Sequence, residues 1–307
     1  MRPNASLGVD WPRVFLWATV GLLASAAPFY LAWAWTHSFA PVRFFYDYPA
    51  NVFFVVIAII GCWLCWIAWL EFGPGDLLRP AWFLIAVAAT WQAIGYIIAH
   101  WLAQATWLNP LRAYLLAGAP RRGATLYQIG LDVSGTLSMA FLAAGLAVVL
   151  VCYRRSGLVR RFVAWDWVVC GLVAAYALHV IYVVVRIQLH AHAVVTFTSV
   201  LDWMNDPLLA LLVAEALLLR RGVLVMGWGL LGRCWGAVAA AVLLTAAGSA
   251  LMWAVDFGLI RWPYFSVTWL IWYPAAAAFA ACPAYQVQAF RVTQRRLELY
   301  RAARHTA

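Results

Sequence analysis

The sequence predicts an all-α, polytopic membrane bundle of about eight transmembrane helices. Of the 307 residues, 66% are hydrophobic and only 10% are charged, whereas a soluble domain carries about a quarter charged residues. Apolar runs of roughly 20 residues, the length that spans a bilayer core, recur along the whole chain. No segment between them is polar enough to form a sizeable soluble domain.

The predicted spans follow one another with short connections. Their bounds are 13–36, 52–70, 80–107, 131–153, 165–187, 198–219, 234–256 and 265–287. The first span resembles a signal peptide around residues 24–26, but its apolar run continues to Trp35, which favours an uncleaved helix. We expect a single transmembrane domain over 1–287 and a basic amphipathic cytoplasmic tail over 288–307.

The sixth span contains a sequence that disfavours a continuous helix. Proline restricts the residue before it to non-helical geometry and fits the first position of a helix. Asp206 would then cap a helix from Pro207 to about Arg220, which is too short to cross about 30 Å of hydrocarbon. We therefore expect this span to be kinked or broken near Asp206-Pro207, with its second half starting in a polar pocket.

The arginines predict the orientation. All 21 basic residues are arginine, and 15 of them fall on one side of the eight-span topology against 6 on the other. The positive-inside rule makes the richer side, with both termini, cytoplasmic. Because these charges lie at helix ends beside the lipid bilayer, the net charge of +10 does not indicate nucleic acid. The absence of lysine excludes a retinal Schiff base. We expect a multi-pass protein of the bacterial cytoplasmic (inner) membrane.

Five of the six histidines fall on the outer side of this topology. They are His37, His100, His179, His190 and His192. His100 and His179 lie about seven and eight residues from the outer ends of spans three and five, so both sit roughly 10–12 Å below the boundary. Two imidazoles at equal depth on facing helices can ligate haem b or a related tetrapyrrole. The leading hypothesis is therefore a membrane redox subunit that exchanges electrons with a quinone or a partner protein.

Two other hypotheses remain open, and with them the question of whether the protein is an enzyme. His190, His192, Asp202 and Asp206 form a second polar layer on the outer side, and such ligands suit zinc in a membrane hydrolase or transferase that also uses His179. Their spacing matches no established metal motif, and solvated loop histidines also explain it. Alternatively, the polar cluster is a hydrated cavity in a non-enzymatic sensor or a structural subunit of a larger membrane complex.

Two weaker signals favour packing over chemistry. Cys62 and Cys65 form a CxxC pair in the middle of span two, whereas a thioredoxin-like motif stands at a helix start after a strand. Glu215 is a lone acid within span six. We expect a structural role for it, either protonated or hydrogen-bonded.

Overall fold

Helices make up almost all of the described chain, and no strand occurs in it. The structure is a computed structural model that describes residues 9–98, 120–157, 164–190, 197–226, 229–256, 259 and 265–306. The helices are α1 (Trp11–Thr36), α2 (Ala40–Phe45), a π-helical turn (Tyr46–Ala50), α3 (Asn51–Glu71), α4 (Arg79–Tyr96), α6 (Pro120–Arg155), α7 (Ala164–His190), α8 (Phe197–Met226), α9 (Leu230–Asp256) and α10 (Phe265–Thr306). A long helix coincides with all or part of each predicted span.

Five segments of the described chain are long and apolar enough to cross a membrane. They are Trp11–Thr36, Tyr48–Glu71, Val133–Arg155, Leu230–Met252 and Val267–Tyr300. The all-helical architecture is therefore confirmed, and the five segments are consistent with a membrane bundle. The count of eight spans stays a prediction, because α4, α7 and α8 do not meet the same criteria over their described residues.

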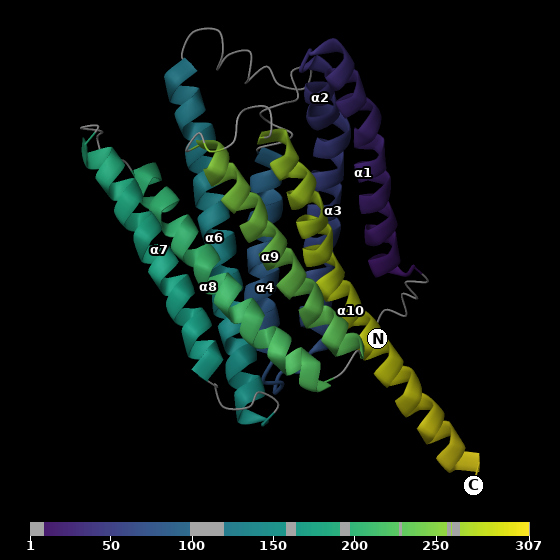
Figure 1. Ribbon diagram of the computed structural model, residues 1–307. Helices are drawn as coiled ribbons and strands as arrows, with labels where there is room; N and C mark the ends of the chain where they lie inside the picture. Colours follow the sequence, from purple (N-terminus) through teal and green to yellow (C-terminus); the bar gives the residue numbers. More distant parts are fainter. Residues whose placement is uncertain are drawn as a thin grey trace.

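Six of the helices pack in a closed ring. In order around the ring, α3 packs on α4, α4 on α6, α6 on α8, α8 on α9, α9 on α10, and α10 returns to α3. Helix α1 packs outside the ring against α10, and α7 packs outside it against α8. Figure 1 shows these two helices at opposite margins of the bundle. The ring encloses the interior in which a site can form.

Large side chains fill the interior of the ring toward the end of the bundle that carries the chain termini. Trp82 of α4 and Trp235 of α9 are fully buried, with ring centroids 5.9 Å apart. The Trp235 indole N–H donates to the hydroxyl of Tyr153 in α6. Small residues bring α3 and α10 together, since a Cβ on Gly61 would lie 3.0 Å from the Cβ of Ala280.

Of the prediction that the sixth span is kinked or broken near Asp206-Pro207, the break is wrong and the kink stays a prediction. Helix α8 runs without interruption and carries Pro207 inside it. Proline removes one backbone hydrogen bond, but membrane helices tolerate this loss where neighbouring helices supply polar partners. Near the proline, Thr136 Oγ1 of α6 donates to Asn205 Oδ1 at 2.8 Å and so joins α6 to α8. No helix begins at Pro207, and Asp206 does not cap one.

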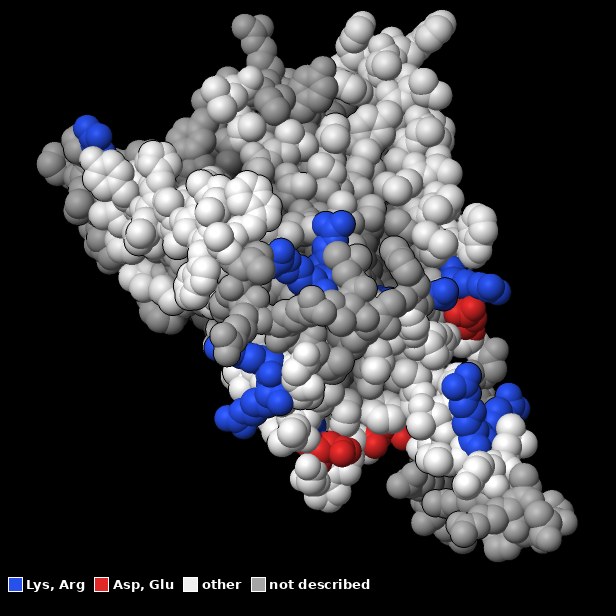
Figure 2. All heavy atoms as spheres, turned by 60° about the horizontal axis from the view of Figure 1, so that its bottom comes forward, with Lys and Arg blue, Asp and Glu red and all other residues white. Residues whose placement is uncertain are grey.

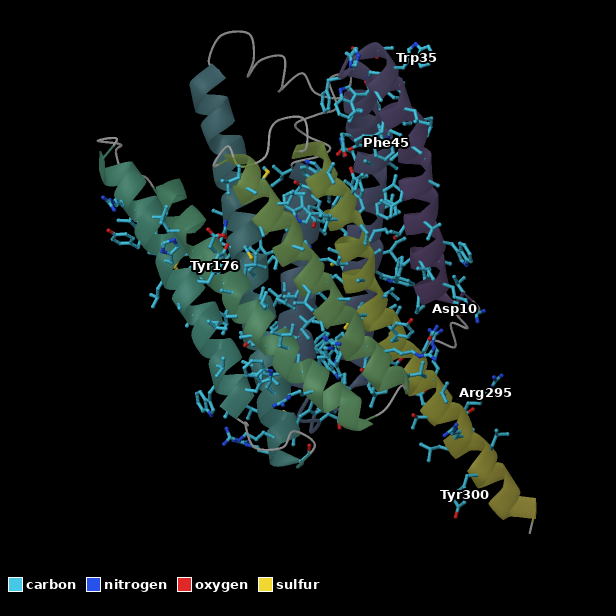
Figure 3. The ribbon with its side chains drawn as sticks, in the orientation of Figure 1. Asp10, Trp35, Phe45, Tyr176, Arg295 and Tyr300 are labelled. Carbon is cyan, nitrogen blue, oxygen red and sulfur yellow. The ribbon has the colours of Figure 1, made fainter. Side chains whose placement is uncertain are left out.

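The predicted tail is continuous with the last span. Helix α10 passes through residue 288 without a break and projects beyond the bundle, where Figure 3 labels Arg295 and Tyr300. Its base is anchored by Phe290, whose ring meets that of Phe72 edge to face at 4.8 Å. The boundary at 288 is therefore not a boundary between helices.

Arginines gather at the end of the bundle that holds the start of α1 and the end of α10, and Figure 2 shows this face. The described arginines at this end are Arg13, Arg79, Arg154, Arg155, Arg220, Arg221, Arg233, Arg291, Arg295 and Arg296. Toward the other end lie Arg186 of α7 and, by their positions along the helices, Arg43 in α2 and Arg121 and Arg122 in the first turn of α6. This asymmetry agrees with the predicted orientation, and the assignment of the arginine-rich end to the cytoplasm stays a prediction.

Candidate functional site

A cavity of about 470 Å³ lies inside the ring, in the half of the bundle away from the termini. Every one of the six ring helices contributes to its wall. This volume falls in the range of small-molecule sites, which is about 300–1,000 Å³. Aliphatic side chains, alanines and one phenylalanine form much of the wall: Met139, Leu142, Leu209, Leu212, Ala241, Val242, Ala275, Ala276 and Phe279.

Aromatic rings form one side of the cavity. Phe54 of α3 meets Tyr96 of α4 at 4.8 Å and Trp269 of α10 at 5.8 Å, both edge to face. Trp269 and Trp272 of α10 are perpendicular, with centroids 5.0 Å apart. These contacts hold the rings in fixed orientations, and flat aromatic surfaces favour a ligand that is itself planar.

Polar groups stand on opposite sides of the cavity. In the ring of six helices, α4 is directly across from α9. Helix α4 contributes Gln92 and Tyr96, whose side chains are joined by a 3.1 Å hydrogen bond from the amide to the hydroxyl. Helix α9 contributes Thr245 and Ser249, and α6, between them, contributes the buried Ser138. The Thr245 hydroxyl already donates to the Ala241 carbonyl, whereas the Gln92 amide and the Ser249 hydroxyl can donate to oxygens on two edges of one ligand.

The cavity carries no formal charge on the lining residues that the structure describes. Burying an ion in such surroundings costs several kcal/mol or more unless the ion is paired. A neutral ligand is therefore favoured. Because the site lies among apolar helices of a membrane bundle, a ligand that is soluble in lipid is also favoured.

One buried acid lies between the cavity and the end of the bundle that carries the chain termini. Glu215 of α8 is 6% exposed, and its Oε2 has no hydrogen-bond partner in the described part of the structure. It follows Leu212, a cavity residue, by three positions, so the two lie on the same helix face about one turn apart. The expected structural role of this carboxyl stays a prediction.

The structure describes only one of the two predicted haem ligands, so it does not test the pair. His100 lies outside the described residues, and His179 is exposed on α7, outside the six-helix ring. Haem ligation by these residues stays a prediction. An absorption spectrum of the solubilised protein, oxidised and then reduced, tests it: sharp α and β bands on reduction are expected with haem bound.

The predicted zinc ligands are described only in part. His192 lies outside the described residues, and the side chains of His190, at the end of α7, and Asp202, within α8, lie outside the description too. Asp206 is half-buried on α8 and lines the same hollow as Tyr176 of α7. Among the described side chains no group of three potential metal ligands occurs, so zinc binding also stays a prediction.

Sequence reasoning missed the cavity because its polar residues are uncharged and spread over several spans. One signal was present. Gln92 and Tyr96 are four residues apart, as are Thr245 and Ser249, and residues four apart share a helix face. Polar pairs at this spacing inside apolar spans indicate faces that turn toward a polar interior.

Comparison with family models, with curated proteins and with solved structures gives no match for this chain.

Proposed function

We propose that the protein is a membrane-embedded binding protein for a lipid-soluble quinone, held with its ring in the central cavity. The observation that carries this proposal is an uncharged cavity with aromatic walls and hydrogen-bond donors on opposite helices. A quinone is neutral and planar, and it carries two carbonyl oxygens on opposite edges of its ring. Its role here is that of a quinone-binding subunit, which agrees with the redox hypothesis without requiring a haem.

The donors match the two ends of such a ring. The Gln92 amide lies on α4, and the Ser249 hydroxyl lies across the cavity on α9. Each hydrogen bond from a neutral donor contributes about 0.5–1.5 kcal/mol net. Stacking against Trp269 or Trp272 adds about 0.5–1.5 kcal/mol beyond the area that is buried.

The proposal is tested by titrating the purified, delipidated protein with a tail-free benzoquinone and following the heat of binding. Ala241→Leu puts a larger side chain into the cavity, and we expect it to weaken binding at least about tenfold, which is about 1.4 kcal/mol. Ala240→Leu is the matched control, because Ala240 is the preceding residue of α9 and is exposed. We expect this control to bind like the wild type.

Two results would contradict the proposal. The first is a wild-type protein that gives no saturable heat with the quinone. The second is an Ala241→Leu variant that is folded and binds as tightly as the Ala240→Leu control.

A further inference from the structure

A second hollow lies on the outside of the ring, between α7 and α9 and over α8. This lateral groove has a volume of about 320 Å³. Leu172, Val173 and Tyr176 of α7 form one wall, and Ala246 and Ala250 of α9 lie on the other. Asp206 and Val213 of α8 lie in it as well.

The lateral groove meets the central cavity. Leu209 of α8 and Ser249 of α9 line both hollows. The two spaces therefore lie on either side of the same two side chains.

The groove opens toward the bilayer. Helix α7 packs against α8 outside the ring, and it leaves Leu172 66% exposed and Tyr176 53% exposed. Figure 3 shows Tyr176 on this margin of the bundle. In a membrane-spanning bundle, such a surface faces lipid acyl chains.

The groove is polar at one end only. Asp206 and Tyr176 lie toward the outer end, and Val213 and Leu172 lie about one to two turns further into the bundle. A hydrocarbon chain that leaves the cavity at Leu209 is therefore directed away from the carboxylate and along the apolar part of the groove.

We propose that the lateral groove seats the hydrocarbon tail of the ligand whose ring occupies the cavity, and that the ligand reaches the cavity sideways from the bilayer between α7 and α9. This inference rests on the proposed quinone-binding function. It assigns a ligand class with two parts: a planar head in the cavity and an isoprenoid tail in the groove. Leu209 and Ser249 mark the point at which head and tail join.

The test compares the affinities of two quinones that share the same head. Both are measured with the whole 307-residue chain reconstituted in phosphatidylcholine nanodiscs. One quinone has no tail and is labelled, and the other carries a long isoprenoid tail and competes with it. Ala246→Trp fills the groove without adding to the cavity wall, and Val173→Trp does so from α7 should the first variant not fold. Ala247→Trp is the matched control, since Ala247 is exposed on α9 next to the groove residue.

We expect the tail-free quinone to bind the wild type, Ala246→Trp and Ala247→Trp within about twofold of one another. The long-tailed quinone should lose about tenfold or more of its affinity in Ala246→Trp alone. If the long-tailed quinone binds Ala246→Trp and Ala247→Trp equally well, the lateral groove does not hold the tail. The proposed function would then still stand. An equal loss for both quinones in Ala246→Trp would also overturn the placement of the tail in the lateral groove. Failure of both quinones to bind the wild type would instead overturn the proposed function and this inference with it.

Discussion

Gly248 of α9 lies directly against the indole of Trp272, one of the cavity walls. A Cβ added at Gly248 would contact the Trp272 Nε1, would lie 2.6 Å from Cδ1 and would lie 3.0 Å from Cε2. Separations below about 3.4 Å are shorter than carbon van der Waals contact. In Gly248→Ala, therefore, either the ring or the helix has to move. A moved ring also strains the 3.3 Å hydrogen bond from its Nε1 to the Thr245 carbonyl.

The size of this effect follows from opposing contributions. Alanine is favoured over glycine in a helix interior by about 1 kcal/mol. Overpacking costs about 1–3 kcal/mol, and loss of the indole hydrogen bond costs about 1 kcal/mol more. In Gly236→Ala, on the same helix, only the helix preference of alanine acts, because nothing lies within 4 Å of the added Cβ. We expect Gly248→Ala to be about 2–4 kcal/mol less stable than Gly236→Ala.

Thermal unfolding of both variants in the same detergent, followed by circular dichroism, measures this difference. Titration with the tail-free benzoquinone shows whether the displaced ring alters the cavity, and we expect weaker binding by Gly248→Ala only. Two equally stable variants would refute the packing argument. A destabilised Gly248→Ala that binds the quinone like the wild type would refute the placement of the ligand against Trp272.

Two further predictions concern α8. Thr136→Val removes the hydrogen bond to Asn205 and should destabilise the contact between α6 and α8 by about 0.6–2 kcal/mol. We expect a lower melting temperature of the variant. An unchanged melting temperature would show that the bond contributes nothing to stability. Glu215→Leu replaces a buried carboxyl whose Oε2 has no partner in the described structure, so we expect equal or greater thermal stability. A strongly destabilised Glu215→Leu would contradict this by revealing a partner for the carboxyl.

Much of the fold was predictable from local composition. Apolar runs of membrane-spanning length coincide with the long helices, and the arginines predicted the asymmetry between the two ends. The failure at Pro207 has a specific cause. The preference of proline for a helix start is local, whereas a helix packed among other membrane helices can continue through a proline, as α8 does.

The candidate site was less predictable. Ionisable residues inside membranes are costly and therefore conspicuous, so the sequence drew attention to His100, His179 and Asp206. His100 lies outside the described residues; of the other two, the structure places Asp206, and not His179, in the wall of the lateral groove. The cavity itself is lined by uncharged residues such as Ser138 and Ser249, whose chemistry does not distinguish them from packing residues.

The sequence by itself determined that this chain forms apolar helices suited to a membrane. It also determined that arginines are more numerous at one end of these helices than at the other. Both properties sum over residues close together in the chain, since transfer to lipid and helix formation depend on each segment alone. Only the tertiary structure decided that α4 faces α9 across a closed ring, with a cavity between them and a groove beside α7. Those features arise from side-chain packing between segments far apart in sequence, where small residues and interhelical hydrogen bonds select the neighbours of each helix.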